Sequence, residues 1–341
     1  MKKWSDSDVT KESRRIQSFT AASSVPLKLF LNRDFVESVV NRKFIIPYHI
    51  QLNPTAKCYP DGCPWCSCLN RDRSKELTYD EIIETFRLAI SYGARATTIT
   101  GDGDPLCHPK ISDIVADINK MGVDVGIVNN GWLIHCLSPE ALDRTTWMRI
   151  SLGDLQAPKP ETWWEHVESV VMDFPAIDYS FSYVLTRYPD IQLIEKMIRF
   201  ASEHIFTHIR IVSNLLEADQ LAETMEKTRK KVKKHVDDSL VIWQSRSEWT
   251  RGTKNCYLSL AKPVLGSDGL WYCCCGCQYL DKVPARKYVY PMSKLRCAEG
   301  LKDIIENQRW FNGSICYRCY YGNYNYFLGV LMDGIKHTSF I

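Results

Sequence analysis

The chain has 341 residues, 45% of them hydrophobic and 24% charged, and its formal net charge is +3. No apolar run approaches the roughly 18 residues of a membrane-spanning helix, and residues 1–20 lack the apolar segment of a secretion signal. We therefore expect a cytoplasmic protein with no membrane partner, whose 14 cysteines suit metal binding better than disulfides.

Strand-like and helix-like segments alternate from residue 45 onward. The first strand is predicted over residues 45–52, and the helix after it, residues 78–92, begins with a capping box of Thr78 and Glu81. Further strands are predicted over residues 96–100, 123–128, 148–152, 177–185 and 206–212, and further helices over residues 109–121, 161–172, 190–203 and 217–235.

This alternation predicts an α/β fold on a parallel sheet, in which the chemistry gathers at the carboxyl ends of the strands. We expect an N-terminal extension over residues 1–44, a core over residues 45–236 and a smaller C-terminal domain over residues 237–341. The site should therefore lie in the loops that follow the core strands.

A cysteine loop follows the first predicted strand. Cys58, Cys63 and Cys66 lie within nine residues, with Cys68 nearby. A cubane [4Fe-4S] cluster takes four ligands, so three thiolates would leave one iron open to a substrate or cofactor. A zinc site that uses Cys68 as the fourth ligand is the alternative, because structural zinc takes closed sets of four.

Small and polar residues follow the next strands. Residues 101–105 contain two glycines, which let the backbone approach a ligand, and Asp104, which can pair with an ammonium group. Residues 129–131 follow the third strand, and Ser151 lies near the end of the fourth. Each segment alone also fits an ordinary turn. Their placement after successive strands favours one shared site.

These motifs together resemble those of the radical S-adenosylmethionine (radical SAM) superfamily. The cysteine loop, with Trp65 before its last cysteine, is similar to the cluster motif, and residues 101–105 and 129–131 are similar to the Gly-Gly-Glu-Pro and Thr-Asn-Gly motifs. Two features depart from the pattern. The first cysteine spacing has four intervening residues instead of three, and Asp102 and Asp104 replace the second Gly and the Glu.

The resemblance, which covers roughly residues 45–235, implies a partial (β/α)6 TIM-type barrel. It implies a [4Fe-4S] cluster on Cys58, Cys63 and Cys66, with S-adenosylmethionine on the open iron as the source of a 5′-deoxyadenosyl radical. An external electron donor of the flavodoxin or ferredoxin kind is implied as a partner. The resemblance assigns contacts with S-adenosylmethionine to Trp65, Gly101, Asp102, Gly103, Asp104, Asn129, Asn130, Gly131 and Ser151.

Eight further cysteines lie beyond residue 250. Their order resembles the auxiliary-cluster region of radical SAM enzymes with a SPASM or twitch domain, and the absence of cysteine at Asn325 and Gly329 favours the shorter twitch form. The resemblance implies one auxiliary [4Fe-4S] cluster on Cys256, Cys274, Cys316 and Cys319. Cys273 is an alternative to Cys274, the roles of Cys275, Cys277 and Cys297 stay open, and zinc at these positions is a second possibility.

The substrate is less defined than the chemistry, and no radical-quenching residue is predicted. Residues 50–55 and 66–72 resemble a group of bacteriophage radical SAM proteins, which implies isomerisation of N-linked to C-linked glycyl-thymidine in viral DNA, in the cytoplasm of a bacterial host. The basic run 227–234 and the tyrosines in 317–326 would suit DNA, although such a run is more often a solvated helix face and such tyrosines more often serve packing.

Three alternatives to the DNA isomerase stay open. Peptide maturation is one, although the residues before the first strand are too few for a leader-peptide domain. Oxidation of a small molecule is another. A cysteine-rich, metal-bound nucleic-acid-binding module is the non-enzymatic alternative, but it leaves the ordered motifs at the strand ends unexplained. We therefore expect an isomerase first and an oxidoreductase second.

Overall fold

A computed structural model describes residues 28, 31–68, 71–156, 158–247, 249–275, 291–334 and 336. Within them, one sheet runs in the order β7-β6-β5-β4-β3-β2-β1-β8-β9. The strands are β1 (His49–Leu52), β2 (Ala96–Ile99), β3 (Asp124–Asn129), β4 (Trp147–Gly153), β5 (Asp178–Leu185), β6 (Phe206–Ser213), β7 (Val241–Gln244), β8 (Val264–Leu265) and β9 (Trp271–Tyr272). Strands β1 to β7 are parallel and pair in chain order, which confirms the predicted α/β class and partial barrel.

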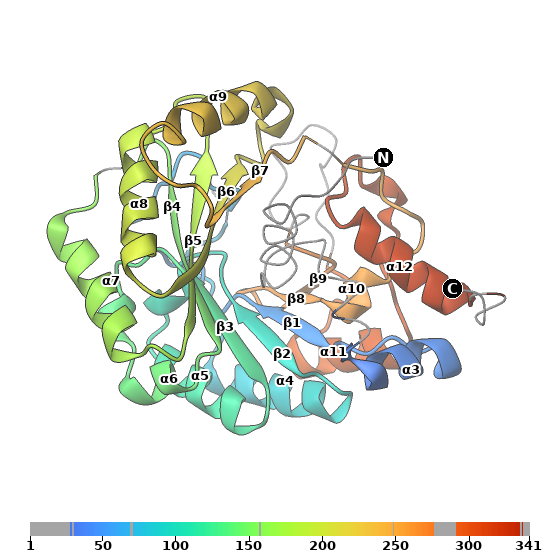
Figure 1. The fold of residues 1–341 in the computed structure, drawn as a ribbon. Coiled ribbons are helices and arrows are strands. Elements are labelled where there is room, and N and C mark those ends of the chain that lie inside the picture. Colours follow the sequence, from blue (N-terminus) through green and yellow to red (C-terminus); the bar gives the residue numbers. More distant parts are fainter. Residues whose placement is uncertain are drawn as a thin grey trace.

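Helices cover the outer face of the curved sheet (Figure 1). The helices are α3 (Arg33–Arg42), α4 (Tyr79–Ser91), α5 (Ile111–Lys120), α6 (Pro139–Asp143), α7 (Glu161–Asp173), α8 (Ile191–Glu203), α9 (Ala222–Val232), α10 (Leu258–Ala261), α11 (Cys297–Glu306) and α12 (Gly322–Asp333). Short 3-10 turns are η2 (Pro105–Cys107), η3 (Ile134–Cys136), η4 (Ala218–Gln220) and η6 (Gly313–Ile315). The capping box is present: Thr78 Oγ1 accepts from the Glu81 amide, and the Glu81 carboxylate accepts from the Thr78 amide.

The two faces of the sheet have different chemistry, because successive side chains on a strand point to opposite sides. On β4, Met148, Ile150 and Leu152 are fully buried and belong to the apolar core between sheet and helices. The alternating residues Arg149 and Ser151 are only partly buried. They face the inside of the barrel, which is where a site can form.

Three element predictions require correction. The first strand starts at His49 rather than Ile45, because Pro47 lacks the N–H that a ladder needs. The helix predicted over residues 217–235 is the turn η4 followed by α9. The sheet has seven consecutive parallel strands rather than six, because the short β-branched and aromatic segment Val241–Gln244 pairs with β6.

The C-terminal segment adds to the same sheet. β8 pairs in parallel with β1, and β9 returns antiparallel to β8. Helix α11 packs on α4, where Arg296 forms an ion pair with Glu81 at 2.8 Å. The boundaries proposed at residues 44 and 236 stay predictions. Among the helices described, none has the length and apolarity required to cross a bilayer.

Candidate metal centre

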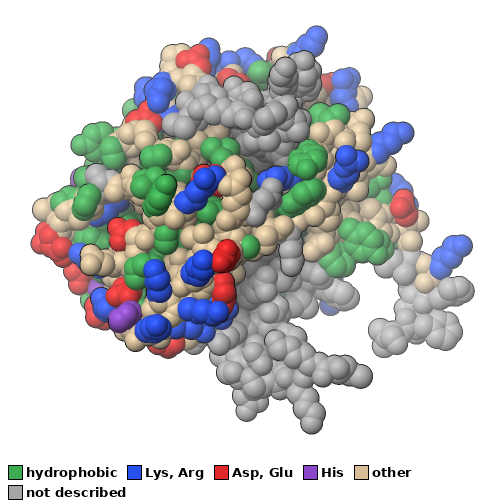
Figure 2. All heavy atoms as spheres, turned by 90° about the horizontal axis from the view of Figure 1, so that it is seen from above, with side chains coloured by type: hydrophobic (Ala, Val, Ile, Leu, Met, Phe, Trp, Pro, Cys, Tyr) green, Lys and Arg blue, Asp and Glu red, His purple; other side chains and the backbone are tan. Residues whose placement is uncertain are grey.

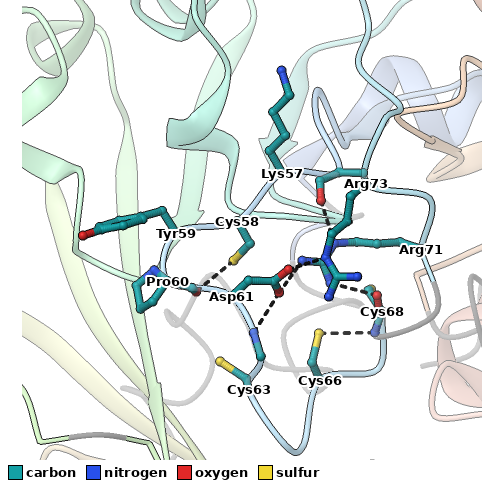
Figure 3. A network of polar contacts seen from close by, with 12 residues as sticks. Lys57, Cys58, Tyr59, Pro60, Asp61, Cys63, Cys66, Cys68, Arg71 and Arg73 are labelled. Atoms are coloured by element: carbon teal, nitrogen blue, oxygen red, sulfur yellow. Dashed lines mark hydrogen bonds and ion pairs between the residues drawn. The ribbon is translucent and has the colours of Figure 1, made fainter.

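The three-cysteine loop leaves the carboxyl end of β1 and is held from inside by Arg71. The Arg71 side chain is 1% exposed and pairs with Asp61 at 2.7 Å. It also donates to the carbonyl oxygens of Ala56 and Cys68 at 2.6 and 2.9 Å. Figure 3 shows Arg71 and Asp61 beside the thiols of the loop. Arg71 lies in the stretch 66–72 but was not among the predicted site residues; its role is to fix the loop's shape.

The three thiols lie within electrostatic reach of one another. Burial, followed by the charge of Asp104, raises the pKa of Cys58 to about 12, and burial also raises the pKa of Cys63. A hydrogen bond from Cys68 lowers the pKa of Cys66 to about 6. Metal ligation requires thiolates. A positively charged iron cluster would supply the stabilisation that Cys58 and Cys63 lack without it.

The cysteines fit a multi-iron cluster better than a single ion. In the described part of the chain, no three His, Cys, Asp or Glu side chains converge on one ion. Zinc requires four ligands around one point, whereas a cubane gives each thiolate its own iron. Cys68 lies beside Cys66, whose Sγ accepts from the Cys68 amide at 3.4 Å, and the Cys68 thiol lies 3.9 Å from the carbonyl oxygen of Gly101.

Glycines bring residues 101–104 against the cysteine loop. The amides of Gly103 and Asp104 donate to the carbonyl oxygens of Thr55 and Lys57 at 3.0 and 2.8 Å. A Cβ on Gly103 would lie 1.8 Å from the Lys57 oxygen, and one on Gly101 would lie 1.7 Å from the Gly103 oxygen. Only glycine permits this approach, so the segment is built to support the loop.

The two carboxylates of this segment have protein partners. Asp104 accepts from the amides of Leu106 and Asn130 at 2.9 and 2.7 Å, and burial raises its pKa to about 6. Asp102 accepts from Asn53 Nδ2 at 2.7 Å and from the Ser267 amide and hydroxyl at 2.9 and 2.6 Å. Both therefore tie strand ends together, and their contact with a cofactor stays a prediction.

Residues 129–131 complete one wall of the site. Asn130 Nδ2 donates to the Tyr59 carbonyl at 2.8 Å and lies 3.9 Å from Cys58 Sγ. Gly131 has φ +80°, and a Cβ there would lie 2.5 Å from the Trp163 ring. Asn129 is 3% exposed, yet its Nδ2 has no partner among the described residues. An orphaned buried amide is unusual in a folded protein and fits a bound ligand.

Trp65 and Ser151 lie at the end of β4. Trp65 Nε1 donates to the Asp154 carbonyl at 2.9 Å, and its ring packs so closely on Gly153 that a Cβ there would lie 2.5 Å away. Ser151 Oγ accepts from Ser182 Oγ at 3.2 Å. The structure thus brings the cysteine loop and the ends of β2, β3 and β4 together, although the role of each residue in cofactor binding is untested.

The loop after β4 adds two residues that motif spacing did not indicate. Gln156 Nε2 donates to Cys63 Sγ at 3.1 Å. The Lys159 ammonium lies 5.0 Å from the centroid of the Trp132 ring, and burial lowers its pKa while the charges of Cys63 and Asp104 raise it. Position after the carboxyl end of β4 was the only available signal for either.

A second group of cysteines lines a pocket in the C-terminal segment. Its lining includes Cys256, Cys273, Cys274, Cys316 and Cys319. A Cβ on Gly252 would lie 2.0 Å from the Gly313 oxygen and 2.8 Å from the Cys316 Cβ, so glycine lets the two cysteine-bearing loops touch. Burial and nearby Cys274 raise the pKa of Cys256 to about 12.

The remaining described cysteines of the C-terminal segment lie in different surroundings. Cys297, at the start of α11, is buried beside Glu81 and Arg296 and is not among the residues that line the pocket. Cys275 Sγ lies 3.0 Å from the Tyr321 hydroxyl. Cys277 lies outside the described residues. The choice between Cys273 and Cys274 stays open, because both line the pocket.

Comparisons with known proteins point in one direction. The family model described as Radical SAM superfamily matches residues 52–151. A segment of 76 residues is 39% identical to the [FeFe] hydrogenase maturase subunit HydE of Thermotoga maritima. The aligned segment makes up 21% of this chain and 22% of the maturase. The chain therefore aligns with about a fifth of that relative's length.

Solved structures share the fold at low identity. Streptococcus suis SuiB bound to precursor peptide SuiA has a TM-score of 0.58 at 12% identity, over 87% of this chain and 77% of SuiB. SuiB bound to S-adenosylmethionine has a TM-score of 0.56 at 13% identity, over 88% and 73% of the two chains. The structure of anSMEcpe with bound AdoMet has a TM-score of 0.53 at 13% identity, over 79% of this chain and 84% of anSMEcpe.

Proposed function

We propose that this chain, whose residues 52–151 match the radical SAM superfamily, is a radical SAM enzyme with a [4Fe-4S] cluster on Cys58, Cys63 and Cys66. The observation that carries the proposal is the three-cysteine loop at the carboxyl edge of the parallel sheet, with the ends of β2, β3 and β4 around it. When bound, the cluster and S-adenosylmethionine supply a 5′-deoxyadenosyl radical that abstracts a substrate hydrogen.

The protein's own residues hold and shape this site. The Gln156 amide fixes the orientation of Cys63, and the Lys159 charge favours the nearby thiolates. The orphaned Asn129 amide is a donor available to an adenosine or methionine oxygen. Trp65, packed on Gly153, limits access of water from that side.

Anaerobic reconstitution tests the proposal. With iron, sulfide and a flavodoxin- or ferredoxin-type reductant, the proposed electron donor, the protein should cleave S-adenosylmethionine to 5′-deoxyadenosine. Cys63→Ala should abolish cleavage, while Cys136→Ala, an exposed cysteine of η3, should retain it. A protein shown to carry four irons on the loop but unable to cleave S-adenosylmethionine would refute the proposal.

We also propose an auxiliary [4Fe-4S] cluster on Cys256, Cys316, Cys319 and one of Cys273 or Cys274. The shared pocket and the close approach of Gly252 to Gly313 support it. Iron should approach about eight atoms per chain. Cys316→Ala should halve the iron content while the EPR signal of the loop cluster persists. Four irons in both proteins would contradict this proposal.

For the substrate, we propose a hypermodified thymidine in viral DNA, isomerised from the N-linked to the C-linked glycyl form. Its support is the resemblance of residues 50–55 and 66–72. The basic run gives little support: on α9, Lys227 and Lys230 pair with Glu223 and Glu226, and basic and acidic side chains intersperse on the face in Figure 2. The test is mass spectrometry of nucleosides after incubation with glycyl-thymidine DNA. Unchanged nucleosides with active S-adenosylmethionine cleavage would refute this substrate.

Peptide modification is the second candidate. It is favoured by one observation, the likeness in fold to SuiB, which was solved bound to a precursor peptide. Because identity is only 12%, the likeness concerns the fold. Peptide-dependent stimulation of 5′-deoxyadenosine formation, absent with DNA, would select this candidate over the first.

A further inference from the structure

Two segments of the C-terminal part lie side by side at the surface, next to the pocket that the second group of cysteines lines. Thr250 and Cys319 exchange backbone hydrogen bonds at 3.1 and 2.7 Å, which joins residues 249–254 to residues 310–320. Both segments contribute to the lining of the pocket. Their exposed side chains include Arg251, Lys254, Ile315 and Tyr317, with Trp249 and Arg318 partly buried beside Tyr317. These six residues are called the pocket rim below.

The rim exposes large apolar side chains beside a cysteine of the pocket. Ile315 is 52% exposed and Tyr317 is 43% exposed. Ile315 ends η6, and Tyr317 follows Cys316, which lines the pocket. Apolar side chains that are exposed together mark a contact surface for another molecule more often than scattered ones do. The rim is therefore a candidate docking surface.

Three side chains of the rim are already held in place by one another. The Arg318 guanidinium lies 5.4 Å from the centroid of the Trp249 ring and 5.6 Å from that of the Tyr317 ring, and the two rings are 5.3 Å apart. Trp, Tyr and Arg are the residue types that contribute most at protein interfaces. Side chains ordered before binding lose less entropy when a partner docks. Because Arg318 lies over both rings, this stack suits a protein partner better than a nucleic acid, whose bases need free ring faces.

The charge of the rim is positive. Residues 249–254 and 310–320 contain the cationic residues Arg251, Lys254 and Arg318 and no Asp or Glu. Within the part of the chain that the structure describes, neither Arg251 nor Lys254 forms an ion pair with a carboxylate. A surface of one sign attracts a partner of the opposite sign and speeds their encounter. The rim therefore fits an acidic partner.

The position of the rim indicates what such a partner would do. Arg251 and Arg318 line the same pocket as Cys256, Cys316 and Cys319. A protein docked on the rim would therefore lie next to these thiols and to any metal that they hold. Electron transfer between proteins requires such a short separation of the two redox centres, and it commonly uses small, weak interfaces. A rim of this limited size is sufficient for that kind of contact.

We propose that the pocket rim is the docking surface for an acidic one-electron carrier protein, which passes an electron to the metal group in the adjacent pocket. In this step the carrier is oxidised by one electron and the metal group is reduced by one electron, and no bond forms or breaks. The electron step rests on the auxiliary cluster of the proposed function. The docking rests only on the exposed side chains of the rim and their charge.

Isothermal titration of the iron-reconstituted full chain with an oxidised, acidic flavodoxin measures docking without any chemistry. Wild type should bind, and Lys254→Glu and Tyr317→Ala should each weaken binding severalfold. Lys227→Glu on α9 changes the net charge as much as Lys254→Glu does, at an exposed position, and should bind as wild type does. No binding by wild type, unchanged binding by both rim variants, or equal weakening by Lys227→Glu would overturn the proposal. So would rim variants that lose affinity for single-stranded DNA but keep it for flavodoxin.

A second measurement tests the electron step without S-adenosylmethionine. In Cys63→Ala, which lacks a ligand of the loop cluster, reduced flavodoxin should bleach the remaining iron–sulfur absorbance, and adding Lys254→Glu should slow this bleaching severalfold. Dithionite, a small reductant that needs no docking surface, should reduce both proteins at the same rate. Equal slowing with dithionite would overturn the proposal, because the substitution would then have damaged the pocket. Absence of iron from Cys63→Ala would instead contradict the auxiliary cluster, and the titration would decide the docking separately.

Discussion

Replacing Asp102 by alanine should destabilise the fold more than most single substitutions. The side chain is 2% exposed and accepts three hydrogen bonds, from Asn53 Nδ2 and from the amide and hydroxyl of Ser267. Hydrogen bonds to a charged acceptor contribute about 1.5–3 kcal/mol each, with partial compensation by water after truncation. We therefore expect Asp102→Ala to lower the free energy of unfolding by about 4 kcal/mol.

Two related variants give matched comparisons. Ser267→Ala removes only the hydroxyl bond and should cost about 1 kcal/mol, and adding it to Asp102→Ala should cost little more, because the two residues share one network. Asp113→Ala removes an exposed carboxylate that pairs with Lys110 and should cost less than about 0.5 kcal/mol. Urea unfolding followed by circular dichroism measures all of them.

Asp102 ties the ends of β1 and β2 to the turn between β8 and β9. A loss below about 1 kcal/mol in Asp102→Ala would refute it. If stability were unchanged while S-adenosylmethionine affinity fell, Asp102 would instead be the cofactor ligand that the motif comparison predicts.

Three other substitutions test the site and its surroundings. Gly103→Ala should reduce iron loading severalfold, because its Cβ would lie 1.8 Å from a backbone oxygen of the cysteine loop, whereas Gly329→Ala, whose Cβ would lie an ordinary 3.7 Å from the Tyr257 ring, should load normally; equal loading would contradict the packing argument. Burial raises the pKa of Asp154 from 3.8 to about 6, so the folded state favours the neutral carboxyl. The stabilisation that this neutral carboxyl contributes is present below pH 4 and is lost as the pH rises through 6. Relative to Asp154→Asn, wild type should lose up to about 3 kcal/mol over this window in pH-dependent urea unfolding, and parallel curves would contradict it. Gln156→Leu removes the hydrogen bond to Cys63 Sγ and should make the midpoint potential of the cluster more negative in an EPR redox titration, where an unchanged potential would count against the contact.

Features that depend on a few neighbouring residues could be predicted from sequence, because the residues that determine them are close together in the chain. The capping box of α4 and the alternation on β4 are read within a few residues. The start of β1 was misplaced because hydrophobicity outweighed the missing N–H of Pro47. β7 was missed because four residues after a basic helix carry little periodic signal.

The site was predictable only as far as its motifs. The cysteine loop and the strand-end turns meet as expected, but the role of Asp102 depends on Ser267, which only the tertiary fold brings near. The same holds for the arginines inside the barrel. Arg149 and Arg210 lie on strands separated by two helices and a further strand, so their proximity follows from register and not from any local pattern.

The pairing of β8 with β1 also bears on how the protein is made. β1 emerges early from the ribosome, yet Gln51 finds its partner Val264 only after most of the chain has been synthesised. Until then, the strand that leads into the cysteine loop presents an open edge to other chains. A nascent or truncated chain that ends before residue 264 is therefore exposed to aggregation at this edge, and insertion of the proposed iron–sulfur cluster is best timed after synthesis is complete.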